Sequence, residues 1–182
     1  AYYRDHDIEL IAGVAATAID ALQRQVRLAD GRALRYGALL LATGAEPVRL
    51  TIPGADLPHV HYLRSLPDSR ALIAAAANAK RAVVIGASFI GLEAAASLRA
   101  RGLAVHVVAP GARPLEKILG PEIGDFIRAL HEQTHGVHFH LNTKPRAITA
   151  EAVTLENGER IPADLVVVGV GVAPNTDWLA GS

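Results

Sequence analysis

Two short, mainly apolar stretches flank a helix-forming segment in the middle of the chain. Residues 81–85 (RAVVI) and 104–108 (AVHVV) suit strands that are buried on both faces of a sheet. Residues 89–101 lie between them and predict a helix. Gly102 follows as its C-cap, because glycine readily takes the left-handed conformation that ends a helix. The pattern therefore predicts a strand–helix–strand unit.

The same alternation continues on both sides of this unit. Residues 59–62 predict a short strand, and 69–80 predict a helix that Ser65 and Asp68 cap. Pro121 opens a later helix, whose apolar face carries Ile123, Phe126, Ile127 and Leu130 at helical spacing. Alternating strands and helices indicate an α/β protein with a doubly wound parallel sheet, a Rossmann-like fold, in which a β-meander forms the last crossover.

A stretch of the sequence occurs twice, at a constant offset of 127 positions. Residues 26–47 (VRLADGRALRYGALLLATGAEP) and 153–174 (VTLENGERIPADLVVVGVGVAP) align without a gap. Each copy predicts a hairpin around Asp-Gly or Asn-Gly, followed by a buried strand over 38–42 or 165–168. The offset is one domain length, which indicates two related units. Because the first copy lacks a beginning of its own, we expect the chain to be a piece of a longer polypeptide.

Composition narrows the chemistry that these units can perform. The 182 residues include 18 Lys plus Arg and 18 Asp plus Glu, so charge gives no reason to expect a nucleic acid or an anionic membrane as a partner. The absence of cysteine excludes disulfides, CxxC redox chemistry and Cys-ligated metals from this chain. The sequence has no apolar run of membrane-helix length and no signal-peptide pattern. We therefore expect a cytoplasmic protein.

The turn after residues 81–85 carries the strongest chemical signal. In RAVVIGASFIGLEAA, Gly86, Ser88 and Gly91 form a dinucleotide-binding fingerprint with serine at the middle glycine position. Gly86 permits the tight turn, and Gly91 lets helix and strand pack closely. The helix N-terminus then offers N–H groups to a pyrophosphate, and the Ser88 hydroxyl could donate to it as well. A turn used only for packing is the alternative, and the strand–turn–helix–strand context favours the nucleotide site.

The acidic residue that usually clamps the NAD ribose is missing. Residues 109–112 read APGA, with no carboxylate after the second strand. Arg113 or Lys117 could instead meet a 2′-phosphate or the pyrophosphate, or the two could belong to a solvated basic loop. The choice between NAD and NADP therefore stays open.

Taken in order, these motifs carry a family resemblance over essentially the whole chain. The segments LLLATGAEP, HYLRSLPDS, VVIGASFIGLEAA and VVVGVGVAPN are similar to those of two-dinucleotide flavoprotein reductases. The chain most resembles the ferredoxin, rubredoxin and putidaredoxin reductases and the apoptosis-inducing-factor-like proteins. The resemblance implies an oxidoreductase with NAD(H) or NADP(H) and FAD as cofactors. In that family hydride passes from nicotinamide to the flavin, and electrons leave singly for a ferredoxin- or Rieske-type acceptor.

The resemblance also implies roles for individual residues. Glu93 matches a glutamate near the nicotinamide and is the residue expected to act in catalysis. The resemblance assigns no role to Arg113 and Lys117, which stay candidate phosphate contacts on the grounds given above. The other implied cofactor contacts are Gly86, Ala87, Ser88, Phe89, Ile90 and Gly91 at the pyrophosphate; Gly169, Val170 and Gly171 beside the nicotinamide; and Thr43, Gly44, Ala45 and Arg64 beside FAD.

The resemblance divides the chain into four parts. Residues 1–50 would be the later part of an FAD domain, 51–59 a linker, 60–172 an NAD(P)H-binding domain and 173–182 the return to the FAD domain. The family's first FAD fingerprint and its later FAD-binding segment are not in this sequence, so we expect the chain alone to hold FAD weakly or not at all and to be inactive. The resemblance also allows a homodimer.

Residues 131–135 contain a second motif, which suggests a metal site. They read HEQTH, which matches the HExxH pattern of zinc proteases, and His138 and His140 follow closely. The motif falls in the last turn of a predicted helix, where histidine suits the negative end of the helix dipole. We therefore expect no metal site.

Two other functions stay open on the sequence. An apoptosis-inducing-factor-like interaction protein would use NADH binding to control assembly instead of turnover. Another two-dinucleotide flavoenzyme, such as a type II NADH dehydrogenase or a monooxygenase, would share the architecture.

Overall fold

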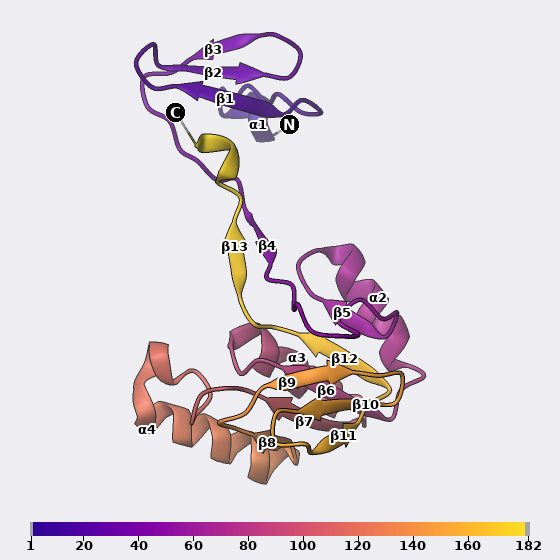
Figure 1. Ribbon diagram of the computed structural model, residues 1–182. Helices are drawn as coiled ribbons and strands as arrows, with labels where there is room; N and C mark the ends of the chain where they lie inside the picture. Colours follow the sequence, from indigo (N-terminus) through magenta and orange to yellow (C-terminus); the bar gives the residue numbers. More distant parts are fainter. Residues whose placement is uncertain (1, 181–182) are drawn as a thin grey trace. The chain divides into compact units, whose positions relative to one another are not determined.

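The computed structural model describes residues 2–180, which form two compact units (Figure 1). Unit 1 comprises residues 2–45 and 174–180, and unit 2 comprises Glu46–Ala173. The chain passes between the units twice. The two crossing segments, β4 (Ala45–Pro47) and β13 (Val172–Pro174), pair as a two-stranded sheet.

Unit 1 contains a small antiparallel sheet with little buried surface. Leu28 is its one buried residue within the described part of the chain. The elements of unit 1 are α1 (Tyr2–Asp5), β1 (Ala16–Asp20), β2 (Gln25–Leu28), β3 (Ala33–Arg35) and the 3₁₀ turn η2 (Asp177–Leu179), with the sheet order β1-β2-β3.

The prediction of a buried strand over residues 38–42 is wrong. These residues form no strand, and Leu40 is 89% exposed. An apolar run becomes a buried strand only when neighbouring strands satisfy its backbone polar groups. None of the described strands of unit 1 pairs with this run.

The prediction of a parallel sheet is confirmed in unit 2. Its five strands lie in the order β5-β12-β6-β7-β8, and every neighbouring pair is parallel. The central strands β6 and β7 have the predicted bounds. The strands are β5 (Val60–Tyr62), β6 (Arg81–Ile85), β7 (Ala104–Val108), β8 (His138–His140) and β12 (Leu165–Val168).

Different elements cover the two faces of this sheet (Figure 1). Helices α2 (Leu66–Ala76) and α3 (Phe89–Ala100) enclose one core, which includes Val84, Val105 and Leu98. On the other face, Val83 and Val166 pack against an antiparallel meander. Its strands are β9 (Pro145–Ile148), β10 (Ala152–Leu155) and β11 (Arg160–Pro162). Alternate residues of the buried strands therefore face two separate cores, as expected for a sheet covered on both sides.

The helices differ from the prediction at their ends. α2 begins and ends earlier than predicted, although Ser65 and Asp68 form the expected capping box. The later helix, α4 (Glu116–Ala129), begins before Pro121 and is interrupted at Gly120, whose φ is 83°. A π-helical turn, η1 (Leu130–Thr134), follows it.

The apolar face predicted for α4 is not part of the core. Ile123, Phe126 and Leu130 are 46%, 64% and 41% exposed. Helical spacing marks a common face of a helix, and it does not show that a neighbour covers that face.

No helix in residues 2–180 is long and apolar enough to cross a membrane.

The sequence repeat corresponds to two hairpin turns with the same hydrogen bonds. Asp30 Oδ1 accepts from the backbone N–H two residues later at 3.1 Å, and Asn157 Oδ1 does the same at 3.0 Å. Gly31 and Gly158 have φ values of 88° and 87°, which explains glycine at both positions. The expected hairpin is thus present in both units.

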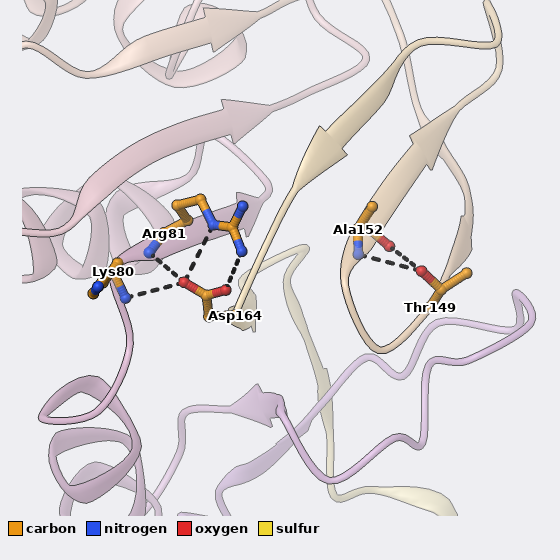
Figure 2. Close-up of polar contacts among 5 residues, drawn as sticks. All are labelled: Lys80, Arg81, Thr149, Ala152 and Asp164. Carbon is orange, nitrogen blue, oxygen red and sulfur yellow. Dashed lines mark hydrogen bonds and ion pairs between the residues drawn. The ribbon is translucent and has the colours of Figure 1, made fainter.

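An ionic contact joins the starts of β6 and β12. The Asp164 carboxylate accepts from the backbone N–H groups of Lys80 and Arg81, at 3.1 and 2.9 Å, and pairs with the Arg81 guanidinium (Figure 2). These partners, with the Arg81 side chain as the largest cause, lower the Asp164 pKa from 3.8 to about 2. The contact fixes the end of the meander to the strand that carries the glycine turn.

Candidate functional site: a cleft at the carboxyl ends of the strands

The glycine turn is packed so closely that side chains cannot replace its glycines. Gly86 has a φ of 111°, and a Cβ on it would lie 2.3 Å from the carbonyl oxygen of Gly169. A Cβ on Gly91 would lie 2.1 Å from the carbonyl oxygen of Gly86. The turn, the first turn of α3 and the residue after β12 therefore form one tightly packed node.

A cleft of about 310 Å³ opens beside this node. It lies where β6, β7 and β12 end, which is the point at which the strand order reverses and where open α/β sheets bind ligands. As the first two residues of α3, Phe89 and Ile90 have N–H groups without partners inside the helix. The cleft is lined by Gly86, Ala87, Ser88, Ala109, Pro110, Gly111, Arg113, Leu115, Glu116, Lys117, Ile118, Gly169 and Val170.

Ser88 serves this node in a way that the sequence did not indicate. It is the N-cap of α3, with φ −83° and ψ 177°, and its Oγ accepts from Gly91 N–H at 3.4 Å. The same hydroxyl donates to the carbonyl oxygen of Gly169 at 2.7 Å. Its one proton is therefore directed at the protein and not at a phosphate position.

Arg113 lines the cleft but already has two anionic partners. Its Nε donates to Asp125 Oδ1 at 2.7 Å, and its NH1 donates to Glu116 Oε1 at 3.0 Å. These contacts, with the Asp125 hydrogen bond first, raise the pKa of Arg113. Lys117 also lines the cleft and is exposed.

The loop that carries Arg113 is held by residues that sequence reasoning missed. Leu115 has a φ of 54°, and its N–H donates to the carbonyl oxygen of Ala87 at 3.2 Å. A Cβ on Gly124 of α4 would lie 2.8 Å from the carbonyl oxygen of Pro114, so the helix presses closely on the loop. The sequence signal that could have indicated the Arg113–Glu116 ion pair was their Arg-x-x-Glu spacing.

Glu93 lies in a different groove from the glycine turn. It is exposed on α3 and lines a groove of about 370 Å³ between α2 and α3, together with Arg64 and Ile90. The predicted site residues of unit 2 thus fall into two sets. Phe89 is 55% exposed and lines neither hollow.

The remaining predicted residues lie where the chain crosses between the units. Gly171 has a φ of 121°, and its carbonyl oxygen accepts from Val48 N–H at 3.0 Å. In unit 1, the carbonyl oxygens of Thr43 and Gly44 accept from the side chain and backbone of Asn175 at 3.3 and 3.0 Å. Ala45 begins β4.

The histidines do not assemble a metal site in the described residues. No group of three or more His, Cys, Asp or Glu side chains within 2–180 could hold a metal ion. In the HEQTH segment, Glu132 accepts from Arg128 Nε at 2.9 Å, and burial together with His135 lowers the pKa of His131. His106 Nδ1 and His140 Nε2 are 2.9 Å apart and form a hydrogen bond between β7 and β8.

Comparisons with known proteins agree with this architecture. Rhodocoxin reductase from Rhodococcus erythropolis is 42% identical over 184 residues, which cover 98% of this chain and 43% of that protein. A ferredoxin reductase structure from Rhodopseudomonas palustris matches with a TM-score of 0.87 and 42% identity, over 97% of this chain and 45% of that one. The structure of a covalent putidaredoxin reductase–putidaredoxin complex matches with a TM-score of 0.85 and 35% identity, over the same shares.

The chain spans less than half the length of these relatives. The family model for pyridine nucleotide-disulphide oxidoreductases matches residues 3–182. The resemblance to ferredoxin and putidaredoxin reductases is therefore confirmed, and the chain belongs to the pyridine nucleotide-disulphide oxidoreductase family.

Proposed function

We propose that the chain supplies the NAD(P)H-binding part of a flavoprotein reductase. Hydride would pass from nicotinamide to FAD, and single electrons would go on to a ferredoxin-like acceptor. The observation that carries this proposal is the cleft where β6, β7 and β12 end, into which the N-terminus of α3 opens. N–H groups at a helix N-terminus, beside a turn without side chains, suit a pyrophosphate.

The names of the relatives support the proposed ferredoxin-like acceptor and the proposed direction of electron flow. Their names describe reductases of rhodocoxin, ferredoxin and putidaredoxin, and one of them is bound to putidaredoxin. These names favour a reductase over an interaction protein or a type II NADH dehydrogenase. Residues 60–172 would form the NAD(P)H-binding domain, and 1–50 would belong to the FAD domain.

The second groove supports the roles proposed for Glu93 and Arg64. Hydride transfer requires the nicotinamide and the flavin to lie against each other. Glu93, the proposed nicotinamide contact, and Arg64, the proposed FAD contact, line one groove. The flavin would supply the redox chemistry, whereas residues of this chain would bind and orient the nucleotide.

The test is a titration of the 182-residue chain with NADH and, separately, NADPH, followed by nicotinamide fluorescence. The variant Val170→Asp places a carboxylate on the cleft wall at a position that is 40% exposed, so the fold should tolerate it. Repulsion of the pyrophosphate should weaken binding about tenfold or more.

Asn157→Asp is the matched control, because it adds the same charge in a turn whose counterpart already has aspartate at position 30. It should leave binding unchanged. No saturable binding of either nucleotide to the unaltered chain would refute the proposed function, and equal binding by Val170→Asp would place the nucleotide elsewhere.

A further inference from the structure

Serine occupies a fingerprint position where glycine usually lets the backbone approach the pyrophosphate. Glycine is not needed there for its backbone freedom, because φ at Ser88 is −83° and any residue can adopt this conformation. The side chain is partly buried, and it makes specific contacts. The structure therefore does more than accommodate a serine at this position, and the role of its hydroxyl group needs a physical explanation.

Its hydroxyl group joins two segments that are far apart in the sequence. Oγ accepts from Gly91 N–H in the first turn of α3 and donates to the carbonyl oxygen of Gly169, the residue after β12. A serine hydroxyl has one proton. Because that proton is directed at Gly169, a phosphate in the cleft is left with backbone N–H groups such as those of Phe89 and Ile90.

Gly169 is held from several sides at this point. A Cβ on it would lie 3.1 Å from Gly91 N, and its carbonyl oxygen lies against Gly86. Its N–H donates to the carbonyl oxygen of Ile85 at 2.8 Å. The Ser88 hydroxyl donates to its carbonyl oxygen at 2.7 Å, so this bond sets the orientation of the peptide that leads into Val170.

The orientation of that peptide matters for one half of a bound dinucleotide. A dinucleotide lies across the point of strand reversal, with its pyrophosphate at the helix N-terminus and its adenosine ribose beside the strand that follows the helix. In this sheet that strand is β7, so the nicotinamide half would lie on the β12 side, against Gly169 and Val170.

We propose that Ser88 is a positioning residue that fixes the Gly169–Val170 peptide through its hydroxyl and thereby shapes the nicotinamide side of the cleft. This inference rests on the proposed function, since it assumes that the cleft binds a dinucleotide. It assigns no phosphate contact to the serine.

The experiment compares NADH with ADP-ribose, which keeps the adenosine and pyrophosphate but lacks nicotinamide. Both are titrated calorimetrically into the chain and into Ser88→Ala. Loss of one hydrogen bond at Gly169 should weaken NADH binding about three- to tenfold. ADP-ribose binding should change less than twofold, because ADP-ribose lacks the nicotinamide that would lie against Gly169 and Val170.

Thr149→Ala is the matched control, because the Thr149 hydroxyl has the same double role in the turn before β10. It accepts from Ala152 N–H at 3.2 Å and donates to the carbonyl oxygen of Ala152 at 3.3 Å (Figure 2). This variant should lower the melting temperature without changing either affinity. A melting curve for each variant separates loss of folding from loss of binding.

The other outcomes are decisive against the proposal. Equal weakening of NADH and ADP-ribose in Ser88→Ala would indicate a direct phosphate contact and would overturn it. So would a Ser88→Gly variant that binds NADH as tightly as the unaltered chain, because the serine would then be only tolerated. If the unaltered chain binds neither ligand, the nucleotide site itself fails, and the positioning role fails with it.

Discussion

Replacing Asp164 by asparagine should measurably destabilise unit 2. The substitution keeps an oxygen that can accept from the N–H groups of Lys80 and Arg81, but it removes the charge that pairs with the Arg81 guanidinium. The variant therefore isolates the electrostatic part of a contact that joins β6 to β12.

The magnitude follows from the pKa of Asp164. Its lowering from 3.8 to about 2 corresponds to about 2.4 kcal/mol of folding free energy, at about 1.36 kcal/mol per pH unit. The side chain is 31% exposed, and solvent screening reduces the value of such contacts. We expect a loss of about 1–2 kcal/mol at pH 7.

Urea unfolding at pH 7 and at lower pH provides the assay. A carboxylate with a lowered pKa stabilises the protein fully above pH 3.8, and this stabilisation is lost as the pH falls towards 2. The difference between the unaltered chain and Asp164→Asn should therefore shrink by about half at pH 3. Glu151→Gln, which removes one charge from an exposed turn, is the control. A difference below about 0.3 kcal/mol at pH 7, or one that does not change with pH, would refute this reasoning.

Three further predictions concern the cleft and the sheet edge. Gly91→Ala should lower the melting temperature by several degrees and abolish NADH binding, because its Cβ would lie 2.1 Å from the carbonyl oxygen of Gly86. Gly158→Ala is the control, since its Cβ would meet no heavy atom within 4 Å, and it should keep NADH binding in the same titration. Burial and the neighbouring His140 and His138 lower the pKa of His106, so stability should fall as the pH drops below about 6.5, and His106→Gln should reduce that slope in urea unfolding between pH 5 and 7.5. Arg113→Gln should weaken NADH and NADPH binding by similar factors, because the Arg113 guanidinium already donates to Asp125 and Glu116. A selective loss of NADPH binding would show instead that Arg113 gives up these two contacts to bind a 2′-phosphate.

The local sequence was sufficient to predict those features that depend only on residues close together in the chain. The bounds of β6 and β7 follow from short, mainly apolar runs, and the turn at Gly86 follows from glycine spacing. The capping box at Ser65 was also predictable, because both of its hydrogen bonds lie within three residues.

Features that depend on distant partners were not predictable. The Ser88 hydroxyl donates to a carbonyl group 81 positions away, so no local pattern could indicate its direction. The early start of α4 was missed because Leu115 provides no side-chain cap and Gly120 interrupts the helix. The run 38–42 has the composition of a buried strand, but composition cannot show whether partner strands are beside it.

The position of β12 between β5 and β6 has a consequence for the order of events during protein synthesis. Leu165 follows Ile85 by 80 residues, which a ribosome adds in about 4 to 16 s. Throughout that interval the apolar edge of β6 has no partner on this side, and the carbonyl group that Ser88 holds has not been made. The nascent chain therefore exposes an aggregation-prone strand edge until the meander is complete, and a chaperone that covers β6 should bind most strongly to chains arrested before Leu165.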